Sequence, residues 1–103
     1  MARVKVRPAA QRDLVQHFAY MGENGSLELA LRFRDSARLT FSELARHPRM
    51  GAPGKLLKFP DLRMWRIRGF EKCLIFYHPS GDDIVIERVV HAAHDYNRIL
   101  ESH

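Results

Sequence analysis

LRMWRIRGFEKCLIFYHPSGDDIVIERVVH, residues 62–91, contains three runs of strand-forming residues separated by turn residues. Leu62–Arg68 and Asp83–His91 alternate side chains between two faces, the period of a strand. Lys72–Tyr77 is apolar on both faces, as expected of a strand in the middle of a sheet. Gly69 and the sequence PSGDD mark the two turns. Because the connections are short, we expect an antiparallel meander.

Two amphipathic helices precede these strands. Pro8 suits a first helical turn, GENG at residues 22–25 ends the first helix, Ser26 is a good N-cap for the second, and Pro48 stops it. The apolar positions that recur every three or four residues are Ala10, Leu14, Phe18, Met21, Ala30, Phe33, Ala37, Phe41 and Leu44. Such stripes pack against a neighbouring layer, and the short turn predicts an antiparallel helical hairpin.

The remaining segments complete the order of elements. Arg3–Arg7 alternates valine with basic residues and predicts a short strand. Residues 48–60 hold three prolines and two glycines and predict a loop, in which Lys55–Phe59 could pair briefly. His94–Glu101 predicts a short closing helix. The 103 residues therefore predict one α+β domain over residues 1–103, ordered β-α-α-β-β-β(-α), with the helical hairpin packed on a mainly antiparallel sheet in two layers.

Composition limits the class of protein. The longest apolar run, Cys73–Tyr77, is far shorter than the roughly 20 residues of a membrane span. The basic start MARVKVRP is not followed by an apolar segment, so we expect no signal peptide. Cys73 is the only cysteine and can form no internal disulfide, which fits a reducing cytoplasm. We expect its thiol to be buried and inert.

The positive charge is concentrated in one segment. Residues 46–72 carry eight basic and two acidic residues, whereas the rest of the chain carries nine basic and ten acidic ones. The net charge of +5 therefore comes from this central segment. Such a concentration suits a nucleic acid or an acidic protein as partner.

The C-terminal region IERVVHAAHDYNRIL, residues 86–100, raises the question of catalysis. His91 and His94 have a spacing that suits two metal ligands, but a zinc site needs a third, and Asp95 is poorly placed to provide it. We therefore expect no metal and no other cofactor. RNA cleavage without metal needs a base, an acid and cations around the phosphate. Residues of these types are Arg63, Arg66, Arg68, Arg88, His91, His94 and Tyr96.

Five motifs together resemble the RelE/ParE superfamily of toxins from type II toxin–antitoxin modules. They are A-x-x-DL at residues 10–14, F-x-x-LARHPRMG at 41–51, LRMWRIRGF at 62–70, an apolar strand ending in Tyr77, and I-x-RVVHAAHDYNRIL at 86–100. The resemblance runs from Val4 to about Leu100 in the same order of elements. It implies the fold described above.

The ParE branch of this superfamily is the more similar one. The sequence RVVH at residues 88–91, followed by Asp95, resembles the RVLH…RD ending of that branch. RelE-type nucleases carry an arginine where this chain has Leu74 and basic residues where it has Ala92 and Ala93, and their catalytic tyrosine comes later than Tyr96. The resemblance therefore implies inhibition of DNA gyrase by binding, without catalysis by the chain itself. Metal-independent, ribosome-dependent cleavage of mRNA is the alternative, and a module without toxicity is a third possibility.

The resemblance also implies partners and contact residues. A ParD-like antitoxin with an acidic C-terminal segment would neutralise a cytoplasmic toxin of this kind. We expect Leu14, Phe18, Phe41, Lys55 and Lys58 to contact the antitoxin; the alternative for Leu14, Phe18 and Phe41 is a purely structural place in the core. We expect Arg63, Arg66, Arg88, His94, Tyr96 and Arg98 to contact the target. In the nuclease alternative the catalytic group would be Arg66, Arg68, Arg88, His91 and Tyr96. His91 would end the last strand, and Asp95 would cap the closing helix or pair with an arginine.

Overall fold

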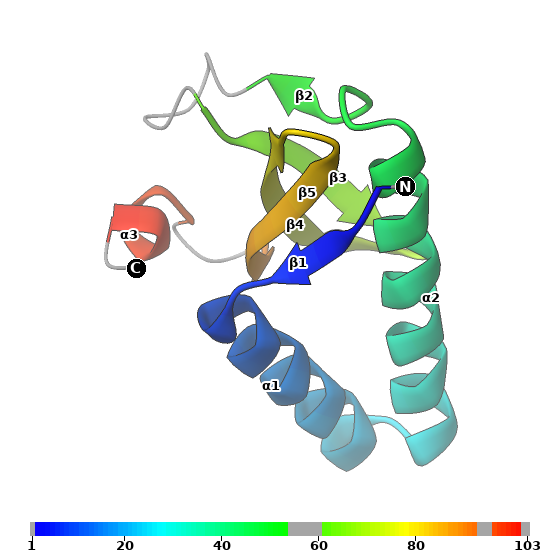
Figure 1. Ribbon diagram of the computed structural model, residues 1–103. Helices are drawn as coiled ribbons and strands as arrows, with labels where there is room; N and C mark the ends of the chain where they lie inside the picture. Colours follow the sequence, from blue (N-terminus) through cyan, green and yellow to red (C-terminus); the bar gives the residue numbers. More distant parts are fainter. Residues whose placement is uncertain (1, 54–60, 93–95, 102–103) are drawn as a thin grey trace.

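A computed structural model describes residues 2–53, 61–92 and 96–101. Its elements are β1 (Val4–Val6), α1 (Pro8–Asn24), α2 (Leu27–Arg46), β2 (Ala52–Pro53), β3 (Arg63–Ile67), β4 (Phe70–Ser80), β5 (Asp83–His91) and α3 (Tyr96–Glu101). Figure 1 shows α1 and α2 as a hairpin beside a twisted sheet. The predicted α+β architecture is confirmed.

The sheet has five strands in the order β1-β5-β4-β3-β2. β3, β4 and β5 form the predicted antiparallel meander. β1 lies parallel to β5, with Val4 opposite Ile84, an arrangement that the alternation of its valines could not specify. β2 lies in the segment predicted as a loop, and it pairs Ala52 with Met64 and Pro53 with Arg63. That part of the loop prediction was wrong, because a proline is tolerated on an edge strand.

The hairpin turn is tighter than GENG suggested. α1 continues through Gly22 to Asn24, and Gly25 follows as its C-cap, donating its N–H to the Met21 carbonyl at 2.9 Å. A Cβ on Gly25 would lie 2.8 Å from the Leu29 side chain, so this close approach of the helices favours glycine. The Ser26 hydroxyl accepts from the Leu29 N–H at 3.0 Å, which confirms the predicted N-cap.

The main core lies between the hairpin and the sheet. It contains the predicted apolar stripe of α2 from Phe33 to Leu44, together with side chains from β3, β4 and β5. A smaller cluster lies on the opposite face of the sheet, where Leu100 of α3 packs with Leu74, Phe76 and Val90. Figure 1 shows α3 on the side of the sheet away from α2. The closing helix thus covers part of the second face, an addition to the two layers that were predicted.

Candidate functional site

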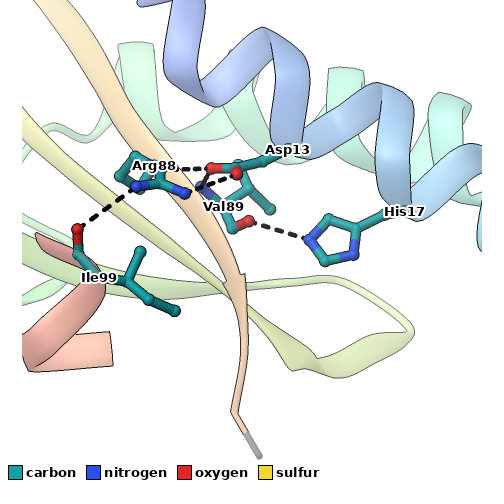
Figure 2. Close-up of polar contacts among 5 residues, drawn as sticks. All are labelled: Asp13, His17, Arg88, Val89 and Ile99. Carbon is teal, nitrogen blue, oxygen red and sulfur yellow. Dashed lines mark hydrogen bonds and ion pairs between the residues drawn. The ribbon is translucent and has the colours of Figure 1, made fainter. Parts of the chain in front are cut away.

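Helix α1 completes the edge of strand β5. β1 covers β5 only from Ile84 to Ile86, and the chain then turns into α1. The Asp13 carboxylate accepts from the Val89 N–H at 2.9 Å, and His17 Nε2 lies 2.9 Å from the Val89 carbonyl oxygen (Figure 2). Because a carbonyl can only accept, the His17 ring is the donor. Two side chains four residues apart on one helix face therefore take the place of a neighbouring strand.

The same carboxylate holds Arg88. The Arg88 Nε and Nη2 groups donate to the two Asp13 oxygens at 2.7 and 2.8 Å, a bidentate pair. The Arg88 side chain is only 17% exposed and the Asp13 side chain only 9%. The hydrogen bonds that Arg88 donates to Asp13 raise the pKa of Arg88 against the opposing effect of burial, so the guanidinium stays charged. Removing one partner of such a buried pair leaves an uncompensated charge.

Arg88 also reaches the C-terminal helix. Its Nη1 group donates to the Ile99 carbonyl of α3 at 3.4 Å, a long hydrogen bond (Figure 2). One guanidinium therefore joins α1, β5 and α3. The sequence reasoning placed Arg88 among target contacts and nuclease cations, and the structure gives it internal partners. The sequence did not predict a role for Asp13, although a carboxylate beside the apolar stripe of α1 indicates a buried polar contact.

Arg63 and Arg66 of β3 and Arg68 of the turn after it each donate to an acceptor of the protein, and Arg66 and Arg68 line the same hollow. Arg63 donates to the Gly51 carbonyl at 2.8 Å and to the Arg49 carbonyl at 3.3 Å. Arg66 donates to the Glu71 carbonyl at 3.2 Å. Arg68 pairs with Glu43 of α2 at 2.7 Å. Each of these predicted cations has its own protein acceptor, and Arg88 lies with Asp13 on another element.

Tyr77, which ended one of the family motifs, fixes the loop after α2. Its hydroxyl accepts from the Gly51 N–H at 2.9 Å and donates to the Pro48 carbonyl at 2.8 Å. Burial raises the pKa of Tyr77, so the phenol remains a donor at neutral pH. Tyr77 and Arg63 together hold this loop against β3.

An apolar groove of about 300 Å³ lies between the two long helices. The residues that line it are Leu14, Val15, Phe18, Phe33, Arg34, Ala37, Arg38 and Phe41. The structure thus brings together Leu14, Phe18 and Phe41, three of the five residues predicted to contact an antitoxin. The other two, Lys55 and Lys58, lie outside the described residues. Val15, which was not predicted, is 68% exposed at this groove.

The structure describes only some of the C-terminal residues that were predicted to contact the target. His91 ends β5, as expected, and Arg98 is exposed on α3. Tyr96 begins α3, while His94 and Asp95 lie outside the described residues. Within the described part of the chain, no three histidine, cysteine or acidic side chains converge as metal ligands. Among the same residues, no helix has the length and apolar composition needed to cross a membrane.

Cys73 has the predicted environment. Its side chain is buried in the main core at 3% exposure, and burial raises the pKa of the thiol to about 11. Because the thiolate is the reactive form, this buried thiol carries little of it at neutral pH.

These observations define a small α+β domain with an apolar groove between its helices. The family model of the ParE toxin of type II toxin–antitoxin systems, parDE, matches residues 4–96, so the chain belongs to the ParE toxin family and is a type II toxin. Among solved structures, it resembles a chain of the chromosomal ParDE system from P. aeruginosa, with a TM-score of 0.74 and 19% identity. That match covers 88% of this chain and 96% of the other, and it shows a shared fold. No curated protein matches the sequence.

Proposed function

We propose that this toxin inhibits DNA gyrase by binding it, and that an acidic ParD-like antitoxin neutralises the toxin by laying a helix in the groove between α1 and α2. The observation that carries the proposal is this groove within a ParE family chain. The name of the similar system, ParDE, supports a cognate antitoxin as the partner.

The groove has the chemistry that an amphipathic acidic helix needs. Phe18 and Phe41 give it an apolar lining, and such a helix would bury its apolar residues there. Arg34 and Arg38, four residues apart on one side of α2, line the same groove. Arg34 already pairs with Asp35, and Arg38 would pair with a carboxylate flanking that apolar face.

The arrangement of cations supports gyrase binding over RNA cleavage. A nuclease needs positive groups that converge on one phosphate. Arg66 and Arg68 donate instead to acceptors of the protein, and Arg88 is held by the buried Asp13. Position 74, basic in RelE-type nucleases, is a leucine buried in the smaller cluster. The predicted target contacts include Arg98, which is exposed on α3.

A purified-protein assay tests the proposal. The toxin is incubated with DNA gyrase, ATP and relaxed plasmid, and loss of supercoiling with accumulation of linear DNA is expected. An Arg98→Glu variant should lose inhibition, whereas Arg12→Glu, an equal charge change at an exposed position on α1, should keep it. Cleavage of mRNA on programmed ribosomes, with gyrase unaffected, would favour the nuclease alternative. Inactivity in both assays would favour a module without toxicity.

A further inference from the structure

A second hollow, of about 450 Å³, lies where α2 ends. It is lined by Arg46, His47, Pro48, Arg49, Pro79 and Gly81, and by Met50, which packs against the main core. Among the described residues that line it, two are permanent cations and none is acidic. The hollow shares no lining residue with the groove between α1 and α2.

Neither arginine of this hollow has a side-chain partner among the described residues. Within the described part of the chain, the side chains of Arg46 and Arg49 make no hydrogen bond or ion pair, whereas Arg63 is engaged by backbone carbonyls. A cation in the last turn of α2 stabilises the helix dipole, and Arg46 alone meets that need. Arg49 lies beyond the helix end, so its charge is available to a ligand.

We propose that this hollow binds the phosphate backbone of duplex DNA. Guanidinium groups match phosphate oxygens with paired N–H donors, and arginine is the preferred side chain for this contact. Because phosphates carry no base identity, the binding would not depend on sequence. The inference goes beyond the proposed function, since it concerns DNA itself and holds whether or not gyrase is the target.

An acidic polypeptide fits the hollow less well. Peptides are commonly recognised through pairing with backbone N–H and C=O groups or through apolar pockets. Pro48 and Pro79, which line the hollow, have no N–H to offer. The apolar surface that would anchor a peptide helix lies in the other groove. We therefore expect Arg46, Arg49 and His47 to make the contacts with the DNA at this hollow.

The test measures the anisotropy of a short fluorescent duplex of mixed sequence as the full chain is titrated at several salt concentrations. An Arg46→Gln/Arg49→Gln variant should bind roughly tenfold or more weakly at about 0.1 M salt, and its salt slope should be smaller by about 2. The matched control is Arg12→Gln/Arg32→Gln. It removes the same charge from two exposed arginines that lie outside the hollow, and its salt slope should stay near that of the parent.

Three results would overturn the proposal. Equal losses in the two double variants would show that net charge, and not the hollow, attracts DNA. Absence of duplex binding by the parent chain at about 50 mM salt, where backbone contacts are strong, would exclude the site. Poly-glutamate that binds as tightly as the duplex, with the same dependence on Arg46 and Arg49, would assign the hollow to an acidic polypeptide. Gyrase plays no part in these measurements, so they are independent of the gyrase assay.

Discussion

Asp13 and Arg88, 75 residues apart in the sequence, form two parallel N–H···O bonds of 2.7 and 2.8 Å across the junction of α1 and β5. The same carboxylate accepts the Val89 N–H, and the same guanidinium reaches the Ile99 carbonyl. The pair therefore fixes the helical hairpin to the sheet and lies against the C-terminal helix. This helix carries Arg98, which we propose to contact the target.

The first prediction concerns this pair. Asp13→Ala should lower the free energy of unfolding by about 3–5 kcal/mol, because it leaves the Arg88 charge buried without its partner. Urea denaturation followed by circular dichroism measures the loss. Arg34 and Asp35 form an exposed ion pair, so Asp35→Ala serves as control and should cost less than about 1 kcal/mol. Equal effects in the two variants would mean that the buried pair contributes no more than a surface pair.

The second prediction concerns the groove. Val15 and Leu39 are both exposed apolar residues on the long helices, at 68% and 64%, but only Val15 lines the groove. Val15→Glu should weaken antitoxin binding at least tenfold, because it places a carboxylate against an acidic, apolar-faced helix. Leu39→Glu should leave the affinity nearly unchanged. Isothermal titration calorimetry with the cognate antitoxin measures both, and similar affinities in the two variants would exclude this groove as the binding site.

The third prediction is that antitoxin binding weakens as salt rises. Exposed charges such as Arg38 at the groove are screened beyond about 8–10 Å at physiological ionic strength. The dissociation constant should therefore increase steadily between low and high salt in the same calorimetric measurement. A constant affinity would mean that the basic residues of the toxin contribute little to the encounter.

The fourth prediction concerns alkaline pH. Burial raises the pKa of Cys73 from its ordinary 9.0 to about 11, so the folded protein keeps the thiol proton that the unfolded chain loses first. The contribution of this neutral thiol is fully present below pH 9.0 and is lost as pH rises toward 11, a change on the order of 2 kcal/mol. Cys73→Ala should show a smaller fall over that range. Urea denaturation of both proteins at each pH measures the free energy of unfolding. An equal fall in the two proteins would contradict the assignment of this pH dependence to Cys73.

The patterns of the sequence predicted the elements better than their long-range pairings. The two outer late strands follow from alternation within Leu62–Arg68 and Asp83–His91, and the middle one from a run that is apolar on both faces, which are local properties. The place of β1 beside β5 does not follow, because Val4 and Val6 would suit several neighbours. The Asp13–Arg88 pair was missed for the same reason, since the two residues meet only when helix and sheet pack. Three residues of the groove were predicted because helical spacing places Leu14 and Phe18 on the apolar face of α1 and Phe41 on that of α2.

The last prediction concerns the loop after α2, which Tyr77 holds and which contributes Pro48 to the hollow lined by Arg46 and Arg49. Tyr77→Phe removes a hydroxyl that accepts from Gly51 and donates to the Pro48 carbonyl, and so leaves two polar backbone groups without their partner. The free energy of unfolding should fall by about 1–3 kcal/mol. Because Pro48 lines the hollow, duplex binding should weaken as well, while antitoxin binding at the separate groove should not change. Gly51→Ala provides a second perturbation of the same contact, since its Cβ would lie 2.6 Å from the Tyr77 hydroxyl. If both variants keep the stability and the duplex affinity of the parent, Tyr77 does not hold this loop in place.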